Sequence, residues 1–433
     1  MNNTVPCTDM KDSGIKWIGS VPASWNVRTL YQLATRVNNK NTDLSEQNLL
    51  SLSYGKIKRK DINTNDGLLP ASFDGYNIIE AGDIVLRLTD LQNDHTSLRV
   101  GHATERGIIT SAYTTLRPIN PAHSRYLYYL IHAFDLKKGF YGMGSGVRQG
   151  LNYDEVKELR VVVPSQREQD AIVTFLDTQC QEIDEWIEQT KASIEEYQIW
   201  KQSIIYEAVT KGITPNVATK DSGTEFGFIP RNWTVIRLKN ISTSIYKGSG
   251  ITKEDVVTDG EIPCVRYGEI YSKYSFYFDN CVTRTNENNV LSKRYFSQGD
   301  ILFAGTGESV EEIGKNIAYL GNDTCLAGGD IIVVTHEQNP VFLSFALNSY
   351  YGQTQKGRGK AKLKVVHISA SDIGNIVVFL PPLEEQKAIA DYLMDKKTAI
   401  DEIISEKQAL ITNLEIYKRS LIYETVTGKR KVV

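Results

Sequence analysis

PSQREQDAIVTFL (164–176) returns further along the chain as PPLEEQKAIADYL (381–393). The match continues without a gap to SIIYEAVTKG (203–212) and SLIYETVTGK (420–429). Each copy opens on proline, one residue in the first copy and two in the second, and then contains neither proline nor glycine until the glycine near its end. Proline in the first turn and glycine after the last turn are the usual limits of a helix. The sequence therefore predicts two long helices made from one duplicated segment.

Short segments of the sequence outside these helices are also repeated. KDSGIKWIGSVPASW (11–25) returns as KDSGTEFGFIPRNW (220–233), and SYGKI (53–57) returns as RYGEI (266–270). Between these segments the two halves diverge, which fits either two related binding surfaces with different targets or duplication followed by drift. The order is globular domain, helix, globular domain, helix. The predicted boundaries are 1–163 for the first recognition domain, 164–212 for the first helical spacer, 213–380 for the second recognition domain and 381–433 for the second spacer.

Short runs of β-forming residues, bounded by Gly, Asn and Asp, predict strands in both globular domains. They are DIVLRL (83–88), YTTLRP (113–118), LRVVVP (159–164), DILFAG (300–305), DIIVVT (330–335) and NIVVFLP (375–381). The apolar segments 124–134 and 341–351 each predict one short helix. This mixture makes the fold class α+β, with a globular α/β domain in each half.

Apolar residues alternate at spacings of four and three along both long helices, which is the pattern of a coiled-coil seam. The seam positions are Leu176, Cys180, Ile183, Ile187, Thr190, Ile194, Tyr197 and Ile204, and at the same register Leu393, Lys397, Ile400, Ile404, Lys407, Ile411, Leu414 and Leu421. Polar interruptions disfavour a strong zipper between two copies of the chain. We therefore expect the helices to pair within the chain as an antiparallel coiled coil, which separates the two domains about a pseudo-twofold axis.

Four aromatic residues on the helices, Trp186, Tyr197, Trp200 and Tyr417, are large for a single helix pair to cover. The simpler interpretation is that they fill the interface between the two helices. The alternative is that they form a docking surface for another subunit, because exposed apolar side chains that gather in one place mark interaction sites.

The bulk composition is that of an ordinary globular protein and excludes several classes. The net charge of −3 at pH 7 argues against a uniformly basic nucleic-acid coat. We find no apolar run long enough to span a membrane, and no signal peptide in the first residues. The five cysteines are scattered without a CxxC pair, so we expect reduced thiols in the cytoplasm and no metal site.

Catalytic motifs are weak or missing. FAGTG (303–307) matches the FxGxG of methyltransferases that bind S-adenosylmethionine, but the Asn/Asp-Pro-Pro-aromatic loop that adenine methylation requires is not found, so we interpret the motif as a turn. GESVEEIGKN (307–316) lacks the spacing of a phosphate-binding loop and carries glutamates where phosphates would bind. We expect a protein that is not itself an enzyme.

Basic, amide and tyrosine side chains are concentrated in the predicted loops of both domains, where they could contact DNA. Arginine, lysine and glutamine donors can match base edges, and lysines beside glycines suit phosphates. Any single one of these residues could also be an ordinary solvated surface residue. The candidates are Tyr54, Lys56, Lys58, Arg59, Arg87, Arg148 and Gln149 in the first domain, and Lys247, Arg266, Tyr267, Lys315, Arg358 and Lys360 in the second.

Taken together, these features resemble the specificity subunit of type I restriction-modification systems. WIGSVPASW (17–25) and FGFIPRNW (226–233) resemble the domain starts of that family, and GSGVRQGLNYDEVKELRVVVP (144–164) resembles one of its internal motifs. PPLEEQKAIADYL (381–393) resembles its helix start. The second domain departs from the pattern at LAGGD (326–330), so base contacts cannot be transferred to it position by position.

The resemblance implies that each globular domain recognises one half of an asymmetric, split target in double-stranded DNA. The helices would set the spacer and dock two modification subunits, which supply S-adenosylmethionine and the adenine methylation chemistry. Restriction subunits would supply the helicase and nuclease activities that use ATP and Mg²⁺. This chain itself would bind none of these cofactors. A second hypothesis is a coiled-coil scaffold that binds proteins rather than DNA through its two terminal domains. A third, a module from a single-chain restriction enzyme, is opposed by the missing catalytic motifs.

Overall fold

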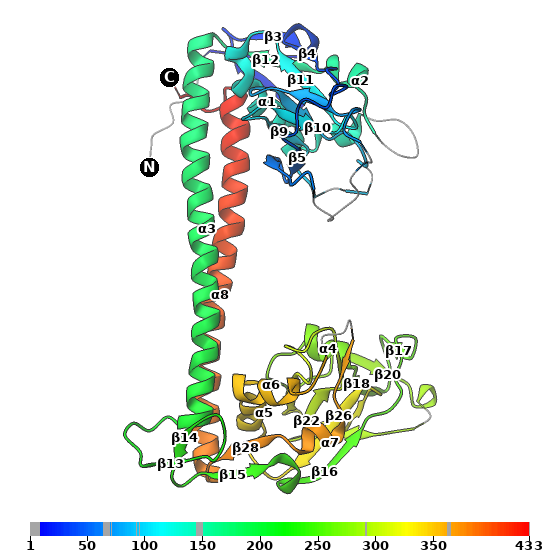
Figure 1. Ribbon diagram of the computed structural model, residues 1–433, viewed down its shortest axis with the longest axis vertical. Coiled ribbons are helices and arrows are strands. Elements are labelled where there is room, and N and C mark those ends of the chain that lie inside the picture. The colour runs from blue at the N-terminus through cyan, green and yellow to red at the C-terminus, as the bar shows by residue number, and fades with distance from the viewer. Residues whose placement is uncertain are drawn as a thin grey trace. The chain divides into compact units, whose positions relative to one another are not determined.

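The computed structural model describes residues 9–63, 70, 72–91, 93–94, 96–143, 150–290, 292–361 and 365–432. Two compact units make up the chain (Figure 1): unit 1 is Met1–Lys191 with Gln408–Val433, and unit 2 is Ala192–Lys407. Each unit contains one globular domain and a segment of each long helix. This division cuts both helices, whereas the repeat places the domain boundaries at the helix ends, and those boundaries remain a prediction.

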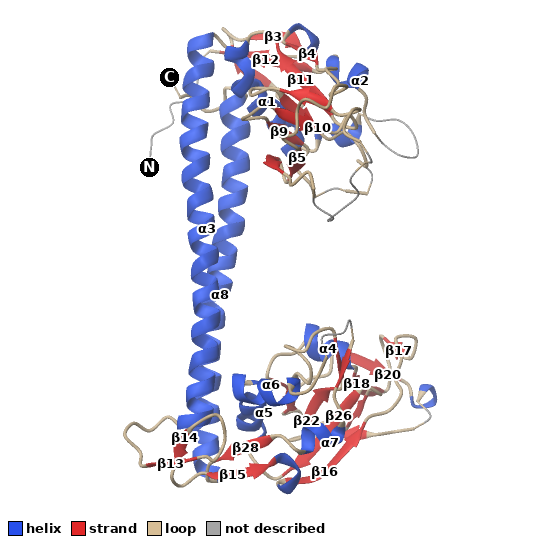
Figure 2. Cartoon of the chain, viewed as in Figure 1, coloured by secondary structure: helices blue, strands red, loops and turns tan. Residues whose placement is uncertain are grey.

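Unit 1 is built on a four-stranded antiparallel sheet with the order β4-β11-β8-β9. Helix α1 packs against β9 and β11 of this sheet, and the other strands form two-stranded pairs (Figure 2). The bounds are β1 Met10–Asp12, β2 Ser20–Pro22, β3 Asn26–Thr29, β4 Ala34–Arg36, β5 Leu50–Ser53, β6 Lys56–Arg59, β7 Asn77–Ile79, β8 Ile84–Leu86, β9 Val100–His102, β10 Gly107–Ile109, β11 Thr114–Pro118 and β12 Arg160–Val163, with helices α1 Ser124–Leu136 and α2 Tyr153–Lys157. Short 3-10 turns lie at Leu30–Gln32, Pro121–His123 and Gly139–Gly142.

The β5–β6 hairpin is anchored to this sheet by apolar contacts. Val85 of the central strand β8 is fully buried and clusters with Leu50 and Leu52 of β5. Ile79 of β7 and Ile109 of β10 belong to the same cluster. The base of the hairpin is therefore held in the core, while its turn projects away from it.

Unit 2 contains two five-stranded sheets, ordered β16-β26-β22-β24-β19 and β17-β20-β18-β25-β21. Helix α5 packs against β24 and α6, and α4 packs against β22. The bounds are β13 Thr219–Asp221, β14 Phe228–Pro230, β15 Thr234–Arg237, β16 Ser242–Lys247, β17 Val256–Val257, β18 Ile262–Val265, β19 Tyr277–Phe278, β20 Thr283–Thr285, β21 Tyr295–Phe296, β22 Ile301–Ala304, β23 Thr306–Gly307, β24 Asn316–Tyr319, β25 Cys325–Ala327, β26 Ile331–His336, β27 Val366–His367 and β28 Val377–Leu380. The short helices are α4 Tyr267–Ser272, α5 Pro340–Asn348, α6 Tyr350–Gly357 and α7 Ala370–Gly374, with 3-10 turns at Leu238–Asn240 and Glu287–Asn289.

Strand β22 shows why the middle of unit 2 is apolar on both faces. Ile301 and Phe303 belong to one hydrophobic cluster with the residues of α5, while Leu302 and Ala304 belong to a second cluster with β25. Successive side chains of a strand point to opposite faces of the sheet, so an unbroken apolar run indicates a strand that is covered on both sides.

Each run of β-forming residues that the sequence singles out contains a strand: β8, β11, β12, β22, β26 and β28. One local prediction is wrong and one holds in part. The single helix expected at 341–351 is broken at Ser349, whose extended backbone (ψ 167°) separates α5 from α6. The turn expected at 303–307 is a bend at Gly305 between β22 and β23: Gly305 donates its N–H to the carbonyl oxygen of Asp330, and Thr306–Gly307 pairs as β23 with β27.

The long helices are α3 Gln166–Lys211 and α8 Leu383–Val426, as the repeat predicts. Ser165 and Glu168 form a capping box at the start of α3, with the backbone N–H of Ser165 3.0 Å from Oε2 of Glu168. Gly212 and Gly428, which follow the two helices, both have a left-handed backbone (φ +76° and +72°). Glycine tolerates this conformation at a helix end better than any other residue.

In unit 1 the beginning of α3 lies beside the end of α8, and the two segments run antiparallel (Figure 1). Ile183 and Ile187 of α3 and Ile411 and Leu421 of α8 are buried, which agrees with the predicted seam. Lys418 and Asp184 form an ion pair of 2.6 Å across the two segments.

In unit 2 the end of α3 lies beside the beginning of α8, again antiparallel (Figure 1). Ile194, Leu393 and Ile400 of the predicted seam are buried. Lys201 and Asp401 form an ion pair of 2.6 Å between the two segments.

Candidate nucleic-acid interface

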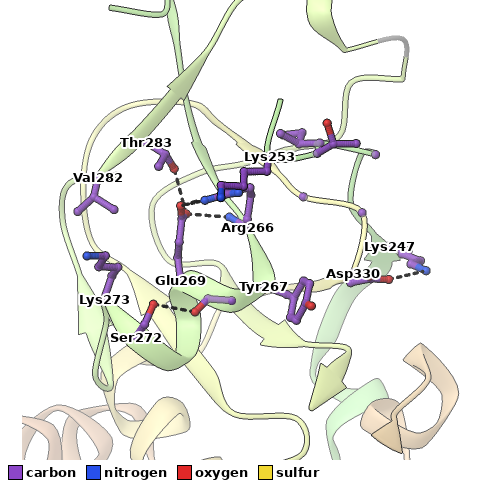
Figure 3. A pocket seen from close by; sticks show the side chains of 16 residues that line it. Lys247, Lys253, Arg266, Tyr267, Glu269, Ser272, Lys273, Val282, Thr283 and Asp330 are labelled. Atoms are coloured by element: carbon purple, nitrogen blue, oxygen red, sulfur yellow. Dashed lines mark hydrogen bonds and ion pairs between the residues drawn. The ribbon is translucent and has the colours of Figure 1, made fainter. Parts of the chain in front are cut away.

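Unit 2 contains a cleft of about 960 Å³ lined by basic side chains, which we call the basic cleft (Figure 3). Its charged side chains come from separate segments of the chain rather than from one run of sequence. The polar residues that define it are Lys247, Lys253, Arg266, Tyr267, Lys273 and Asp330.

Two neighbouring parallel strands, β18 and β25, lead into the basic cleft. Val265 pairs with Ala327 at their carboxyl ends, so the residues that follow both strands leave the sheet at the same edge. Those residues are Arg266 on one side and Gly328 on the other. A Cβ at Gly328 would lie 3.0 Å from the carbonyl oxygen of Val265, so glycine permits the two loops to approach closely.

Arg266 is held against the wall of the cleft by a buried carboxylate. Its Nη2 and Nε atoms lie 3.1 and 3.3 Å from Oε1 of Glu269, and its backbone N–H donates to Oε2 at 2.9 Å. The hydroxyl of Thr283, which has a single proton to donate, lies 2.9 Å from the same Oε2 and 2.8 Å from the carbonyl oxygen of Cys264. Glu269 is only 5% exposed, and its carboxylate accepts from both the backbone N–H and the guanidinium of Arg266.

The net charge of the cleft is positive. Its basic side chains differ in exposure and in whether they pair with an acidic residue. Lys253 and Lys273 are exposed. Lys247 pairs with Asp330 at 3.3 Å, but both side chains are about half exposed or more (68% and 48%). Tyr267 is 40% exposed on the same wall. Such a surface suits a polyanion, because exposed lysines contact phosphates and a fixed arginine can contact a base.

A second cavity of about 380 Å³ shares Lys247 and Asp330 with the basic cleft. It is lined also by Thr306 and His367, whose Oγ1 and Nδ1 atoms are 3.1 Å apart. The ion pair of Lys247 and Asp330 thus belongs to the walls of both cavities.

In unit 1 four of the candidate residues, Tyr54, Lys56, Lys58 and Arg59, lie together on the β5–β6 hairpin. Tyr54 and Gly55 at its turn both have positive φ (48° and 77°), which is the signature of a type I′ turn. Tyr54 is 79% exposed, and Lys56 and Lys58 are exposed on β6. Arg59 is exposed as well, although its guanidinium pairs with Glu105 at 2.5 Å. A two-stranded ribbon with such a tip can enter a DNA groove.

The repeated strings SYGKI and RYGEI follow a strand in both units but fold differently. In unit 1 the chain turns back as a hairpin at Tyr54, whereas in unit 2 it continues as helix α4 from Tyr267. Glu269 supplies the acceptor that caps the start of α4, and Lys56 at the matching position has no acceptor to offer. The structural similarity that the repeat predicts for these segments therefore ends with the strand that precedes Tyr54 in unit 1 and Tyr267 in unit 2.

The structure brings Lys247, Arg266 and Tyr267 together in the basic cleft and leaves the other candidates of the second domain elsewhere. Lys315 is half-buried and donates to the carbonyl oxygens of Tyr271 and Tyr274, so it is not the free surface cation that the sequence suggested. Burial lowers the pKa of Lys315 below its usual range.

Three further candidates, of which Arg358 is exposed and Lys360 and Arg87 are partly buried, have acidic partners. Arg358 pairs with Glu225, Lys360 lies 2.8 Å from Asp372, and Arg87 of the first domain lies 3.7 Å from Asp94. Arg148 and Gln149 lie outside the described residues. Whether any of the candidates contacts DNA stays a prediction.

Sequence reasoning missed Lys253, Lys273 and the Glu269–Thr283 support, because no local pattern connects them. It also missed Arg99, which is fully buried in unit 1. Arg99 donates to the carbonyl oxygens of Arg87, Thr89, Asp90 and Asp94 and so holds the loop between β8 and β9. An isolated arginine in a loop gives no signal of such a role.

Three of the four aromatic residues singled out on the long helices are not buried in the interface between the helices, and the fourth is partly buried. Trp186, Trp200 and Tyr417 are 57%, 50% and 46% exposed, so the interpretation that they fill the helix interface is wrong for these three. Tyr197 is partly buried and contacts the ring of Trp200. The docking interpretation remains a prediction.

Within the described residues no helix is both long and apolar enough to cross a membrane. The same residues contain no group of His, Cys, Asp and Glu that could hold a metal ion. Cys180, Cys264, Cys281 and Cys325 are free thiols, and Cys7 lies outside the described part of the chain.

Comparison with known proteins decides between the hypotheses left open by the sequence. The family model described as "Type I restriction modification DNA specificity domain" matches residues 22–196 and 230–413. The chain belongs to this type I specificity family. The two matched ranges cover both globular domains and most of both long helices.

Curated members of the type I specificity family are similar along most of their length. The "Putative type I restriction enzyme MjaX specificity subunit" of Methanocaldococcus jannaschii is 24% identical over 435 residues, which covers 96% of each chain. The "Type I restriction enzyme MjaVIII specificity subunit" of the same organism is 24% identical over 394 residues, or 88% of this chain and 84% of that protein.

Solved structures from type I systems share the fold. A chain reported under "Structural basis underlying complex assembly and conformational transition of the type I R-M system" has a TM-score of 0.69 at 14% identity, covering 94% of this chain and 99% of that one. The HsdS subunit from Thermoanaerobacter tengcongensis has a TM-score of 0.52 at 14% identity, covering 94% and 98%. At these identities the likeness concerns the fold alone.

Proposed function

We propose that this chain is the DNA sequence-specificity subunit of a type I restriction-modification complex, and that each globular domain recognises one half of a split target. The observation that carries the proposal is the difference between two exposed surfaces that follow the same repeated strand. One surface is the hairpin with Tyr54 at its turn, and the other is the basic cleft around Arg266. Because the surfaces differ, the two half-sites differ, and the target is asymmetric and bipartite.

The two long helices set the distance between the half-sites in this proposal. Antiparallel packing of α3 and α8 in each unit, with buried seam residues, supports one coiled coil with pseudo-twofold symmetry. The recognition domains, residues 1–163 and 213–380, would be held apart by that coil. A rigid spacer fixes the number of unread base pairs in the same way as the geometry of a dimeric DNA-binding protein does.

The catalytic work belongs to partners of the chain in this proposal. Two modification subunits dock on the exposed aromatic residues of the helices and supply S-adenosylmethionine and the methyltransferase activity. Restriction subunits supply the helicase and nuclease that use ATP and Mg²⁺. The chain itself is a recognition subunit without catalytic residues, it binds double-stranded DNA in the cytoplasm, and it has no membrane partner. Family membership disfavours the alternative of a scaffold that does not bind DNA.

Exchange of one domain tests the split recognition. Residues 1–163 would be replaced by the first domain of a related chain, and the methylated sequence would be determined by genome-wide methylation sequencing. We expect one half of the target to change and the other half to stay as it was. A change in both halves, or in neither, would contradict the proposal.

Lengthening the helices tests the spacer role separately. One heptad would be inserted at facing positions of α3 and α8, so that the seam keeps its register. We expect both half-sites to be retained and the unread gap between them to grow. A gap of unchanged length would show that the helices do not set the spacing.

A further inference from the structure

We propose that Arg266 recognises a guanine in the half-site of the second domain, and that Glu269 is the residue that positions it. This inference rests on the proposed function, because it concerns which base the basic cleft selects. It starts from the arrangement in Figure 3, where Arg266 and Glu269 face each other at the wall of the cleft.

The remaining donors of Arg266 determine what it can bind. A guanidinium carries five N–H groups in one plane. Oε1 of Glu269 accepts from Nε and Nη2, and no acceptor for Nη1 is recorded in the part of the chain that the structure describes. The edge formed by Nη1 and the outer N–H of Nη2 is therefore left for a ligand. Two parallel donors on one edge match O6 and N7 of guanine, which is the commonest specific contact of arginine in the major groove.

The support of Arg266 is rigid. The side chain of Glu269 is 6% exposed and that of Arg266 is 28% exposed. Because the backbone N–H of Arg266 donates to Oε2 of the carboxylate and the Thr283 hydroxyl lies 2.9 Å from that oxygen, the guanidinium has little freedom to lose when it binds. Preorganised donors lose less conformational entropy and discriminate more sharply between bases.

The lysines of the cleft are better suited to contacting phosphates than to recognising a base. Lys253 and Lys273 are exposed ammonium groups on flexible stems. An ammonium acts as a point charge and contacts phosphate without regard to sequence, whereas a forked guanidinium reads a pattern of two acceptors. The structure thus separates one base-reading residue from a set of phosphate-binding residues.

The experiment uses the full-length chain and a randomised pool of double-stranded DNA, from which bound duplexes are selected and sequenced. For the wild-type chain we expect a guanine at one position of one half-site, and replacement of that base pair should weaken binding about 10-fold, which corresponds to one bidentate contact. In Arg266→Gln and Arg266→Lys the preference for guanine should disappear at that position alone.

Glu269→Gln and Thr283→Val test the positioning role. Both variants keep the size of the side chain, and the glutamine variant removes a negative charge from the cleft. We expect binding to unrelated DNA to be retained or strengthened while discrimination at the guanine position falls. A merely structural role would instead lower the melting temperature and weaken binding to every sequence together.

Lys273→Ala is the matched control. It should weaken binding to all sequences alike and lower the salt dependence by about one released counterion, without changing any base preference. An unchanged guanine preference in Arg266→Gln would overturn this inference alone. If the wild-type chain selected no sequence at all, the proposed function would fall, and this inference with it.

Discussion

The indole nitrogen of Trp233 donates a hydrogen bond of 2.9 Å to Oε1 of Glu385. In unit 1 the indole nitrogen of Trp25 donates to Oε1 of Glu168 at 3.1 Å. Each tryptophan ends the motif that opens its globular domain, and each glutamate lies in the first turn of the helix that follows that domain. Both units therefore attach a globular domain to a long helix by the same partly buried contact.

Glu385→Ala should lower the free energy of unfolding by about 1–3 kcal/mol, because Trp233 is fully buried and its indole N–H would lose its partner. Urea denaturation followed by tryptophan fluorescence measures the effect. Glu384→Ala is the control, since Glu384 is exposed on the same turn and should change stability by no more than about 0.5 kcal/mol. Equal losses in both variants would mean that the hydrogen bond contributes nothing specific.

Gly428→Ala should destabilise unit 1 more than Gly19→Ala, although both glycines have φ near +70° (+72° and +73°). A Cβ at Gly428 would lie 2.3 Å from Cδ of Pro22, whereas at Gly19 nothing lies within 4 Å. Left-handed strain costs about 1–2 kcal/mol at either site, and crowding against Pro22 adds about 1–3 kcal/mol at Gly428. Thermal unfolding of the two variants separates backbone strain from crowding. Identical shifts in melting temperature would show that Pro22 moves aside at no cost in stability.

The long helices could be predicted from sequence because their signals are local and repeated. Proline starts, glycine stops and the seam through Ile183 and Ile400 each concern neighbouring residues, and the structure bears them out. The basic cleft could not be predicted in full, because parallel pairing of β18 with β25 joins segments that are distant in the chain. Arg266 and Tyr267 were found through the repeat, whereas Lys273 has no counterpart in it.

Burial depends on tertiary packing in the same way. Lys315 looks like an ordinary surface cation in its loop, yet its Nζ turns inward to backbone carbonyls. Trp186 looks like a core residue of a coiled coil, yet more than half of it is exposed. Hydrophobicity gives the preferred environment of a side chain, and only the fold decides whether that environment is available.

Lys356→Met should stabilise unit 2 at pH 7 by about 1–3 kcal/mol, because an ammonium without a carboxylate partner is costly to bury. Lys356 is 1% exposed, and the oxygen acceptor recorded for its Nζ is Oδ1 of Asn316, at 3.0 Å. Desolvation lowers the pKa of Lys356 from 10.5 to about 7. Between these two values the unfolded chain binds a proton that the folded chain does not, so the stability of the wild-type chain rises with pH in that window.

The measurement is the difference in unfolding free energy between the wild-type chain and Lys356→Met at pH 7 and pH 9.5. Other groups titrate in both proteins and cancel in the difference, which should shrink as the pH rises. Lys253→Met, at an exposed position, should show no such trend. A difference that is independent of pH would contradict the burial of a neutral amine.

Tyr54→Ala should leave the fold intact and weaken DNA binding through the first half-site only. The turn at Tyr54 and Gly55 is held by the buried base of the hairpin, and the tyrosine ring itself is 79% exposed, so its removal should change stability by about 0.5 kcal/mol or less. Selection of duplexes should show relaxed preference in one half-site and an unchanged preference in the half-site of the second domain. Relaxation of both half-sites would contradict independent recognition by the two domains.

Trp186→Ser and Tyr417→Ser should lower the amount of modification subunit that copurifies with the chain, without lowering the melting temperature of the chain itself. Trp186, Leu410, Ile416 and Tyr417 all belong to unit 1 and are between 46% and 58% exposed, and exposed apolar side chains of this size favour burial against a partner. Aromatic residues of this kind often dominate an interface, so each loss should weaken association about 10-fold or more. Gln181→Ser, an exposed polar position on the same helix, is the control. Retention of the partner by both aromatic variants would remove this surface from consideration as the docking site.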